Sequence, residues 1–319
     1  MAAAGAPGQR PRVGLRWDPR WDPLELPEIA QTAEQLGYDE LWTVEDCFSA
    51  GGLTSTALAL AATEQIEVGL GLLPAIVRNP AIAAMELAVL GRAYPGRFLV
   101  AFGHGVSDWM QQIGARPANR MPVLEETVEV VRALLRGETL TVVGNHVELH
   151  DVVLEHPPAE PPPILIGTTG PRGLELAGRA ADGIIVVEVA CPAAVEWARA
   201  TAGPDPGRVI VYCFLSLDDD DAAGIAAIRP QVEAWMKSGA FPDMAERAGI
   251  GRDGSGPLSD DLLQTIAAAG SPASCRRTIE GLWAAGADSV VLLPRQGDGI
   301  AQYERFGREV LPALRESAA

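Results

Sequence analysis

The stretch Val68–Phe102, VGLGLLPAIVRNPAIAAMELAVLGRAYPGRFLVAF, contains a complete strand–loop–helix–strand unit. Its first apolar run has glycines at alternate positions, which leave two gaps on one face of the predicted strand. An Asn-Pro pair then predicts a helix start, because asparagine caps helices and proline is accepted in the first turn. Apolar strands joined by a helix indicate a parallel sheet, whose functional residues gather at the carboxyl ends of the strands.

The same unit recurs along the chain, with steps of about 20–30 residues that are typical of a βα repeat. The predicted strands cover residues 13–17, 40–44, 66–73, 98–102, 164–167, 183–187, 208–217 and 289–294. This pattern predicts an α/β fold, a (β/α)8 TIM barrel with insertions after strands 4 and 7. An open doubly wound sheet is disfavoured because no G-x-G-x-x-G opens a helix after the first strand.

The domain organisation expected from these patterns is simple. Residues 1–10 are predicted to be a flexible tail, and residues 11–316 a single barrel domain. The insertion after strand 4 contains an alternating segment, residues 140–149, that crosses Gly144-Asn145 and predicts a β-hairpin outside the barrel. The insertion after strand 7 spans residues 218–271.

The charge balance and the cysteines narrow the class of protein. The net charge is -17, from 25 basic and 42 acidic residues, which disfavours binding to nucleic acid or to anionic membranes. No apolar run predicts a membrane span, and the first residues lack the apolar core of a signal peptide. The 4 cysteines have no C-x-x-C spacing, which favours reduced thiols in a cytoplasmic protein. The histidines of the hairpin give no helical metal pair, so no metal site is predicted.

Two groups of polar residues follow predicted strands at the presumed active face. Glu45 and Asp46 end the second strand, where either could accept hydrogen bonds from a ligand or act as a general base. The alternative, that one of them caps the following segment, is equally compatible with the sequence. His104, between Gly103 and Gly105, follows the fourth strand and could be an acid/base group or a hydrogen-bond donor, or simply a solvated loop residue.

A third group lies after the fifth strand. The small residues Gly167, Thr168, Thr169 and Gly170 lead into a helix start that carries Arg172. Such a loop can bind an anion through its backbone N–H groups, although it can also serve only to turn the chain.

The substrate region is predicted from aromatic residues near the strand ends. Trp17 and Trp109, with Trp21 and the insertion after strand 7, suggest a partly aromatic lid over a small-molecule substrate.

Several segments together resemble the bacterial luciferase-like superfamily of flavin- and coenzyme F420-dependent oxidoreductases. They are residues 33–46 (AEQLGYDELWTVED), 68–90, 96–105 (GRFLVAFGHG), 125–138 (EETVEVVRALLRGE), 161–185 and 285–314. No single motif decides the resemblance, which rests on the order and spacing of all of them.

The resemblance implies where a cofactor would bind. The ring system is expected over the third strand, where members of the superfamily often have a cis non-proline peptide bond; the matching bond is Gly71–Leu72. Asp46 stands where histidine is common. No cation follows the sixth strand, so the cofactor phosphate is expected on Arg172 or Arg295. The expected cofactor-binding residues are Glu45, Asp46, Gly71, Leu72, His104, Gly105, Gly167, Thr168, Thr169, Gly170 and Arg172.

The function implied by the resemblance is hydride transfer between reduced coenzyme F420 and a small organic substrate, with Asp46 and His104 as the candidate proton-transfer residues. Two alternatives remain open: an FMN-dependent monooxygenase that uses oxygen, and a non-catalytic flavin-binding barrel. Members of the superfamily usually pair, and the apolar helices predicted at residues 54–63 and 81–90 offer a surface for a homodimer.

Overall fold

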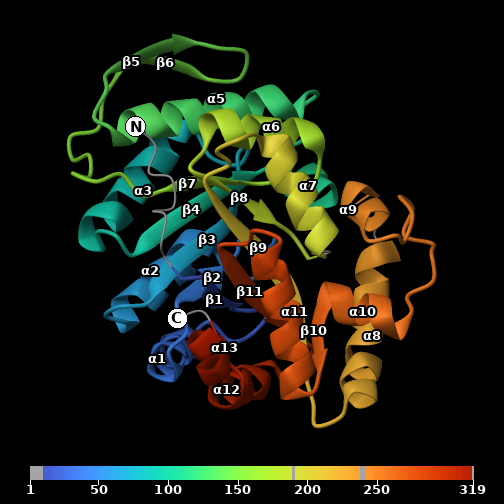
Figure 1. Cartoon of the computed structure of the whole chain (residues 1–319). Coiled ribbons are helices and arrows are strands. Elements are labelled where there is room, and N and C mark those ends of the chain that lie inside the picture. The colour runs from blue at the N-terminus through green and yellow to red at the C-terminus, as the bar shows by residue number, and fades with distance from the viewer. Residues whose placement is uncertain (1–9, 189–190, 238–241, 318–319) are drawn as a thin grey trace.

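Eight parallel strands close into a barrel in the computed structural model, which describes residues 10–188, 191–237 and 242–317 (Figure 1). The strands of the barrel are β1 (Arg12–Arg16), β2 (Glu40–Thr43), β3 (Glu67–Pro74), β4 (Phe98–Gly103), β7 (Ile164–Gly167), β8 (Gly183–Val186), β9 (Arg208–Leu217) and β11 (Ser289–Pro294). Each pairs with the next, and β11 pairs with β1, so these eight strands form a closed ring. The predicted (β/α)8 barrel is confirmed.

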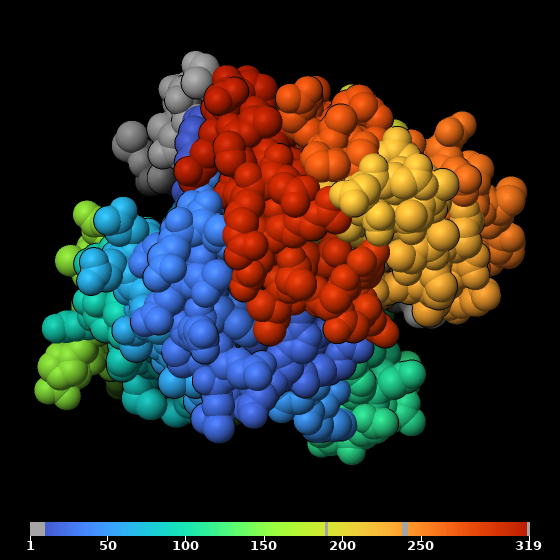
Figure 2. Space-filling view, turned by 90° about the horizontal axis from the view of Figure 1, so that it is seen from below, coloured from blue at the N-terminus to red at the C-terminus, as the bar shows by residue number. Residues whose placement is uncertain are grey.

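Helices cover the outside of the barrel, as expected for strands that are apolar on both faces. They are α1 (Leu26–Leu36), α2 (Gly52–Ala62), α3 (Pro80–Ala93), α4 (Ser107–Gln112), α5 (Arg120–Leu135), α6 (Pro171–Ala180), α7 (Pro192–Ala202), α11 (Pro272–Ala284), α12 (Gly299–Glu309) and α13 (Leu311–Ser317). Helix α3 begins as the sequence predicts: the Asn79 side chain accepts a hydrogen bond from the Ala81 amide, 2.9 Å away. Figure 2 shows the blue N-terminal segments beside the red C-terminal ones, where α1 packs against α12.

Both predicted insertions are present. After β4, the antiparallel hairpin of β5 (Leu140–Val143) and β6 (Glu148–Val152) lies outside α5 and apart from the barrel (Figure 1). After β9, the chain forms α8 (Asp221–Lys237), α9 (Pro242–Arg247), α10 (Asp260–Ile266) and β10 (Ala267–Gly270).

Strand β10 was not predicted from the sequence. It consists of three alanines and a glycine, which have low strand propensity. It forms because it pairs with the carboxyl-terminal part of β9. Of the predicted tail, residues 1–9 lie outside the described residues, whereas Arg10 is placed and donates to Asp39 Oδ2 over 3.2 Å.

Aromatic side chains fill the centre of the barrel in the space that the β3 glycines leave. A Cβ atom at Gly69 would lie 2.5 Å from the Trp42 ring, and one at Gly71 would lie 2.5 Å from the Tyr212 hydroxyl. The Trp42 and Tyr212 rings pack edge to face, with centroids 6.0 Å apart. The close approach that the paired glycines indicate is therefore an approach of core side chains.

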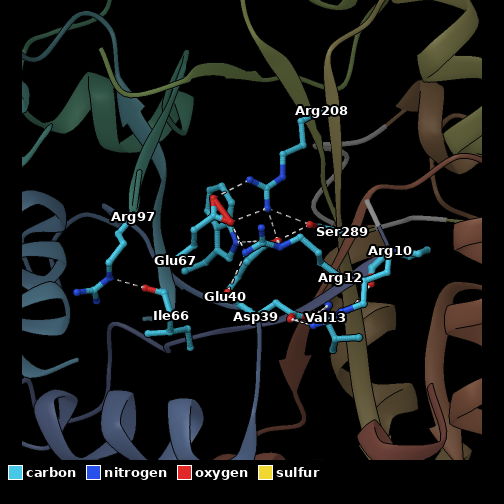
Figure 3. A network of polar contacts seen from close by, with 12 residues as sticks. Arg10, Arg12, Val13, Asp39, Glu40, Ile66, Glu67, Arg97, Arg208 and Ser289 are labelled. Atoms are coloured by element: carbon cyan, nitrogen blue, oxygen red, sulfur yellow. Dashed lines mark hydrogen bonds and ion pairs between the residues drawn. The ribbon is translucent and has the colours of Figure 1, made fainter. Parts of the chain in front are cut away.

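A network of charged residues closes the amino-terminal end of the barrel (Figure 3). Its members are the first residues of five strands: Arg12, Glu40, Glu67, Arg208 and Ser289. The Glu40 carboxylate is fully buried and pairs with Arg12 Nε at 3.0 Å, with Arg208 and with the Ser289 hydroxyl. Arg208 also donates to Glu67 over 2.8 Å. Each buried charge of this network has an opposite partner, as burial requires.

Candidate functional site

The two adjacent carboxylates after β2 have different surroundings. Glu45 forms a bidentate ion pair with Arg78, at 2.5 and 2.8 Å, and its Oε2 also accepts from the amide of Gly52, the first residue of α2, at 3.2 Å. Glu45 thus caps α2, which is the structural alternative that the sequence left open, and its oxygens are already engaged.

The Asp46 carboxylate, in contrast, is free to contact a ligand. In the part of the chain that the structure describes, its carboxylate accepts no hydrogen bond and forms no ion pair. Burial raises the pKa of Asp46, against the opposing effect of Arg16, because a partly desolvated carboxylate without donors is disfavoured as the anion. Such a group can hold and release a proton.

The charges of Arg16 and Glu188 interact with that of Asp46, and neither residue was predicted to belong to the site. Arg16 is the last residue of β1, and its NH1 lies 3.4 Å from Glu188 Oε1. Glu188 follows β8 and is only 5% exposed. An arginine that ends an apolar strand at the active face was the signal that could have identified this cation.

His104 lies at the end of β4 and is half-buried, with no hydrogen-bond partner among the described residues. Burial, with a smaller contribution from the positive charge of Arg120, lowers the pKa of His104 to about 4. Its imidazole is therefore neutral at physiological pH, and can exchange hydrogen bonds with a ligand but cannot act as an imidazolium acid. Gly105, next to it, has a φ of 68°, in the left-handed region that favours glycine.

The bond between Gly71 and Leu72 is cis, as the resemblance implies, and the pairing of β3 with β4 shifts by one residue at this point. The bulge turns the Leu72 side chain across the ends of two neighbouring strands. Cβ atoms at Gly103 and Gly167 would lie 2.5 and 2.7 Å from a Leu72 methyl. The Tyr212 hydroxyl donates to the Gly71 carbonyl over 3.2 Å, which links the bulge to the barrel core.

The loop after β7 forms the predicted helix start. Helix α6 follows Gly170, whose carbonyl accepts from the amides of Gly173 and Leu174, at 3.1 Å each. Thr168 turns its side chain under the helix, because a Cβ at Gly173 would lie 2.0 Å from its hydroxyl. Arg172 is exposed and forms no ion pair within the described residues, so its guanidinium is free for an anion.

The remaining cation that was proposed for the phosphate, Arg295, is engaged. It pairs with Asp298 at 2.7 Å and with Asp218 at 3.6 Å. Of the two candidates, Arg172 is the one whose guanidinium has no carboxylate partner among the described residues.

The two tryptophans expected at the substrate do not share one environment. Trp17 is fully buried and belongs to the hydrophobic core, and its contact with a substrate stays a prediction. Trp109, in α4, is half-buried close to His104 in the chain. Across the described residues, no group of three or more His, Cys, Asp or Glu side chains could hold a metal ion, and no helix is long and apolar enough to cross a membrane.

Comparison with known proteins places these features in a family. The family model for luciferase-like monooxygenases matches residues 8–289. A 5,10-methylenetetrahydromethanopterin reductase from Methanolobus tindarius is 28% identical over 306 residues, covering 87% of this chain and 92% of that protein. An F420-dependent glucose-6-phosphate dehydrogenase from Kineococcus radiotolerans is 27% identical over 325 residues, covering 92% and 94%.

Solved structures share the fold. The coenzyme F420-dependent tetrahydromethanopterin reductase from Methanopyrus kandleri superposes with a TM-score of 0.82 at 22% identity, covering 96% of this chain and 100% of that one. The oxygenating constituent of 3,6-diketocamphane monooxygenase from Pseudomonas putida, solved with FMN, has a TM-score of 0.75 at 18% identity, covering 95% and 99%. With a family model that spans most of its length, the chain belongs to the luciferase-like monooxygenase family.

Proposed function

We propose that this protein is an oxidoreductase that transfers a hydride between reduced coenzyme F420 and a small organic substrate. Two features at the same end of the barrel carry the proposal. One is the β3 bulge at Gly71–Leu72, and the other is the largely buried Asp46 carboxylate, which has no ionic partner among the described residues. The F420-dependent reductases and dehydrogenases among the relatives support the choice of cofactor.

The residues around the mouth fit such a cofactor. The bulge offers a backbone surface for a ring, and the loop from Gly167 to Arg172 offers amide groups and a free guanidinium for a phosphate. When bound, reduced F420 supplies the hydride, and the protein positions the substrate and handles the proton. Asp46 is the candidate group that exchanges this proton, and the neutral His104 donates or accepts a hydrogen bond at the substrate.

A second candidate function is FMN-dependent monooxygenation, which the FMN-bound structural neighbour supports. The two can be separated by titrating the purified cofactor-free protein with F420 and with FMN, and following the absorbance and fluorescence of each. We expect saturable binding of F420, and reduction of a substrate only with reduced F420. Tight binding of FMN alone, with oxygen consumption, would instead support the monooxygenase, and binding of neither would contradict both.

We also propose that the protein is a homodimer that pairs through α2 and α3. Ile82, Met85 and Val89 form one exposed apolar face of α3, at 49%, 52% and 64% exposure, and Leu58 of α2 is 45% exposed. Their spacing puts them on one side of the helix, where a second copy could cover them. Val89→Asp should convert the dimer into a monomer in light scattering. Val143→Asp, on the exposed hairpin, is the matched control and should leave the mass unchanged.

The cytoplasm is the compartment that we propose for the protein. All 4 cysteines are free thiols in the structure, and three of them are buried. Labelling of thiols in freshly lysed cells should find them reduced; a disulfide-linked form would contradict this assignment.

A further inference from the structure

Arg16 is a buried cation with an incomplete set of partners. Among the residues that the structure describes, its buried Nε has no hydrogen-bond acceptor, and its one ion pair is the 3.4 Å contact with Glu188. Arg208, at the opposite end of the same barrel, contacts Glu40, Glu67 and Ser289. Because buried charges are normally saturated with partners, the difference marks Arg16 as a group whose environment is arranged for something other than stability.

The Asp46 carboxylate lies close enough to Arg16 to interact with its charge but does not pair with it. Neither carboxylate oxygen of Asp46 comes within the 4.0 Å that defines an ion pair with the guanidinium nitrogens, whereas Glu188 Oε1 does. The guanidinium is thus held on the β8 side of the mouth, and Asp46, on the β2 side, is left without a donor.

We propose that Arg16 and Glu188 are positioning residues of the active site: Glu188 holds the guanidinium away from Asp46, so that the Asp46 carboxyl stays without an ionic partner and can exchange a proton with the substrate. The use of this proton rests on the proposed oxidoreductase function, whereas the arrangement of the three charges does not.

Burial and the neighbouring carboxylates favour the protonated form of Asp46, whereas the two arginines oppose it. Burial raises the pKa of Asp46, Arg16 opposes the rise, Asp18 adds to it and Arg20 opposes it. Burial likewise raises the pKa of Glu188, Arg16 opposes the rise, and the charge of Asp46 adds to it. The interaction between the two carboxylates is reciprocal, so an ionised Glu188 also favours the protonated form of Asp46.

The other titratable groups at the mouth do not compete for the same role. They are Asp18, paired with Arg20; Glu45, paired with Arg78; the neutral His104; and the Tyr212 and Tyr303 hydroxyls. Burial raises the pKa of both tyrosines well above the ordinary value, so they stay protonated at physiological pH.

A proton at Asp46 suits a substrate with a polarised C=O or C=N bond, whose oxygen or nitrogen needs a proton when its carbon receives a hydride. The substrate carbon would form a C–H bond with the hydride that bound reduced F420 supplies, and the cofactor would be oxidised. The π electron pair moves to the oxygen or nitrogen, which takes the proton from the Asp46 carboxyl. Asp46 is left as a carboxylate beside the Arg16 guanidinium, which stabilises the new negative charge.

The test is a titration of the full-length, cofactor-free protein, labelled with ¹³C at the aspartate carboxyls and observed by NMR. The Asp46 signal is assigned by its loss in Asp46→Asn. In Glu188→Gln, the guanidinium is released toward Asp46 and a like charge is removed, so the titration midpoint of Asp46 should fall by about 1 pH unit, a tenfold change in proton affinity. In Arg16→Met, the midpoint should rise by a similar amount.

Glu148→Gln, at a side chain that is 69% exposed on the hairpin, is the matched control and should leave the midpoint unchanged. Far-UV circular dichroism establishes that each variant is folded; if Arg16→Met does not fold, Glu188→Gln alone decides the sign. A midpoint that stays fixed or rises in Glu188→Gln would overturn the proposal. If the protein does not bind F420 but the Asp46 midpoint still falls in Glu188→Gln and rises in Arg16→Met, the proposed function is overturned and the charge arrangement is supported.

Discussion

Replacing Arg208 should destabilise the barrel, because its guanidinium neutralises a carboxylate that has no access to water. Glu40 is fully buried, and Arg208 supplies one of its two cationic partners (Figure 3). In Arg208→Met, the stem of the side chain can still pack, but Glu40 keeps only Arg12, at 3.0 Å, and the neutral donors of Trp42 and Ser289.

The expected magnitude follows from the remaining partners. Removing one partner of a buried ion pair typically costs about 3–5 kcal/mol, since it leaves an uncompensated charge. Arg12 still compensates part of that charge, so we expect the lower end, about 3 kcal/mol. The control is Arg136→Met, which breaks an ion pair with Glu138 whose side chains are 51% and 49% exposed and which should cost about 0–1 kcal/mol.

The assay is urea denaturation followed by far-UV circular dichroism, at several pH values. Burial alone would raise the pKa of Glu40, yet Arg208 and Arg12 hold it below the ordinary value of 4.5. Wild-type stability from this group is therefore full above that value and is lost as the pH falls below it. In Arg208→Met, the pKa of the folded Glu40 should rise toward or above the ordinary value, so the loss of stability from this group on acidification should become smaller or disappear.

Two results would refute this reasoning. One is a loss in Arg208→Met no larger than in Arg136→Met, which would mean that Arg12 and the neutral donors suffice. The other is an unchanged pH dependence, which would mean that Glu40 is not held ionised by Arg208.

Three further predictions concern the mouth of the barrel. Arg172→Ala should weaken F420 binding about ten- to a hundredfold, which is the effect of losing one charge-assisted contact. Arg295→Ala should bind F420 almost normally. The reverse order of affinities in fluorescence titrations would mean that the phosphate binds at the β11 side. The wild-type protein should lose stability as the pH falls from about 6.5 to 4, because the pKa of His104 is lowered to about 4 in the folded protein and the unfolded chain binds the proton first. His104→Asn should reduce this loss. Identical thermal midpoints of both proteins at each pH would contradict the prediction. Gly71→Ala should destabilise the protein by about 1–3 kcal/mol, since the added methyl would lie 2.5 Å from a core hydroxyl, while Gly281→Ala, in a helix with open space, should be neutral or stabilising in the same urea assay.

The barrel could be predicted from the sequence because each βα unit carries its own signals. The strands are short apolar runs, the helices between them start and end at recognisable residues, and the repeat length is regular. Strand β10 could not be predicted, because its alanines form a strand only through the partner that tertiary structure provides.

The candidate site was predicted in part. Asp46, His104 and the Gly71–Leu72 bulge follow strands at positions where sequence reasoning looks for function. Arg16 was missed because a lone arginine at the end of a strand resembles a solvated flank until burial is known. Local sequence also gives no sign of how deeply a side chain is buried or which partners it finds, so the burial of Trp17 was not predicted and Glu45 was not separated from Asp46.

The interlock between the β3 glycines and the aromatic core has a consequence for how this family can diversify. Trp42 and Tyr212 occupy the volumes that Gly69 and Gly71 leave empty, so no one of the four can change in size alone. Relatives that carry a larger residue at position 69 should have a smaller one at position 42, and the same exchange should hold between positions 71 and 212. The Tyr212 hydroxyl also donates a hydrogen bond to the Gly71 carbonyl. Such linked replacements would therefore shift the backbone of the bulge along the barrel axis and change the depth of the binding site.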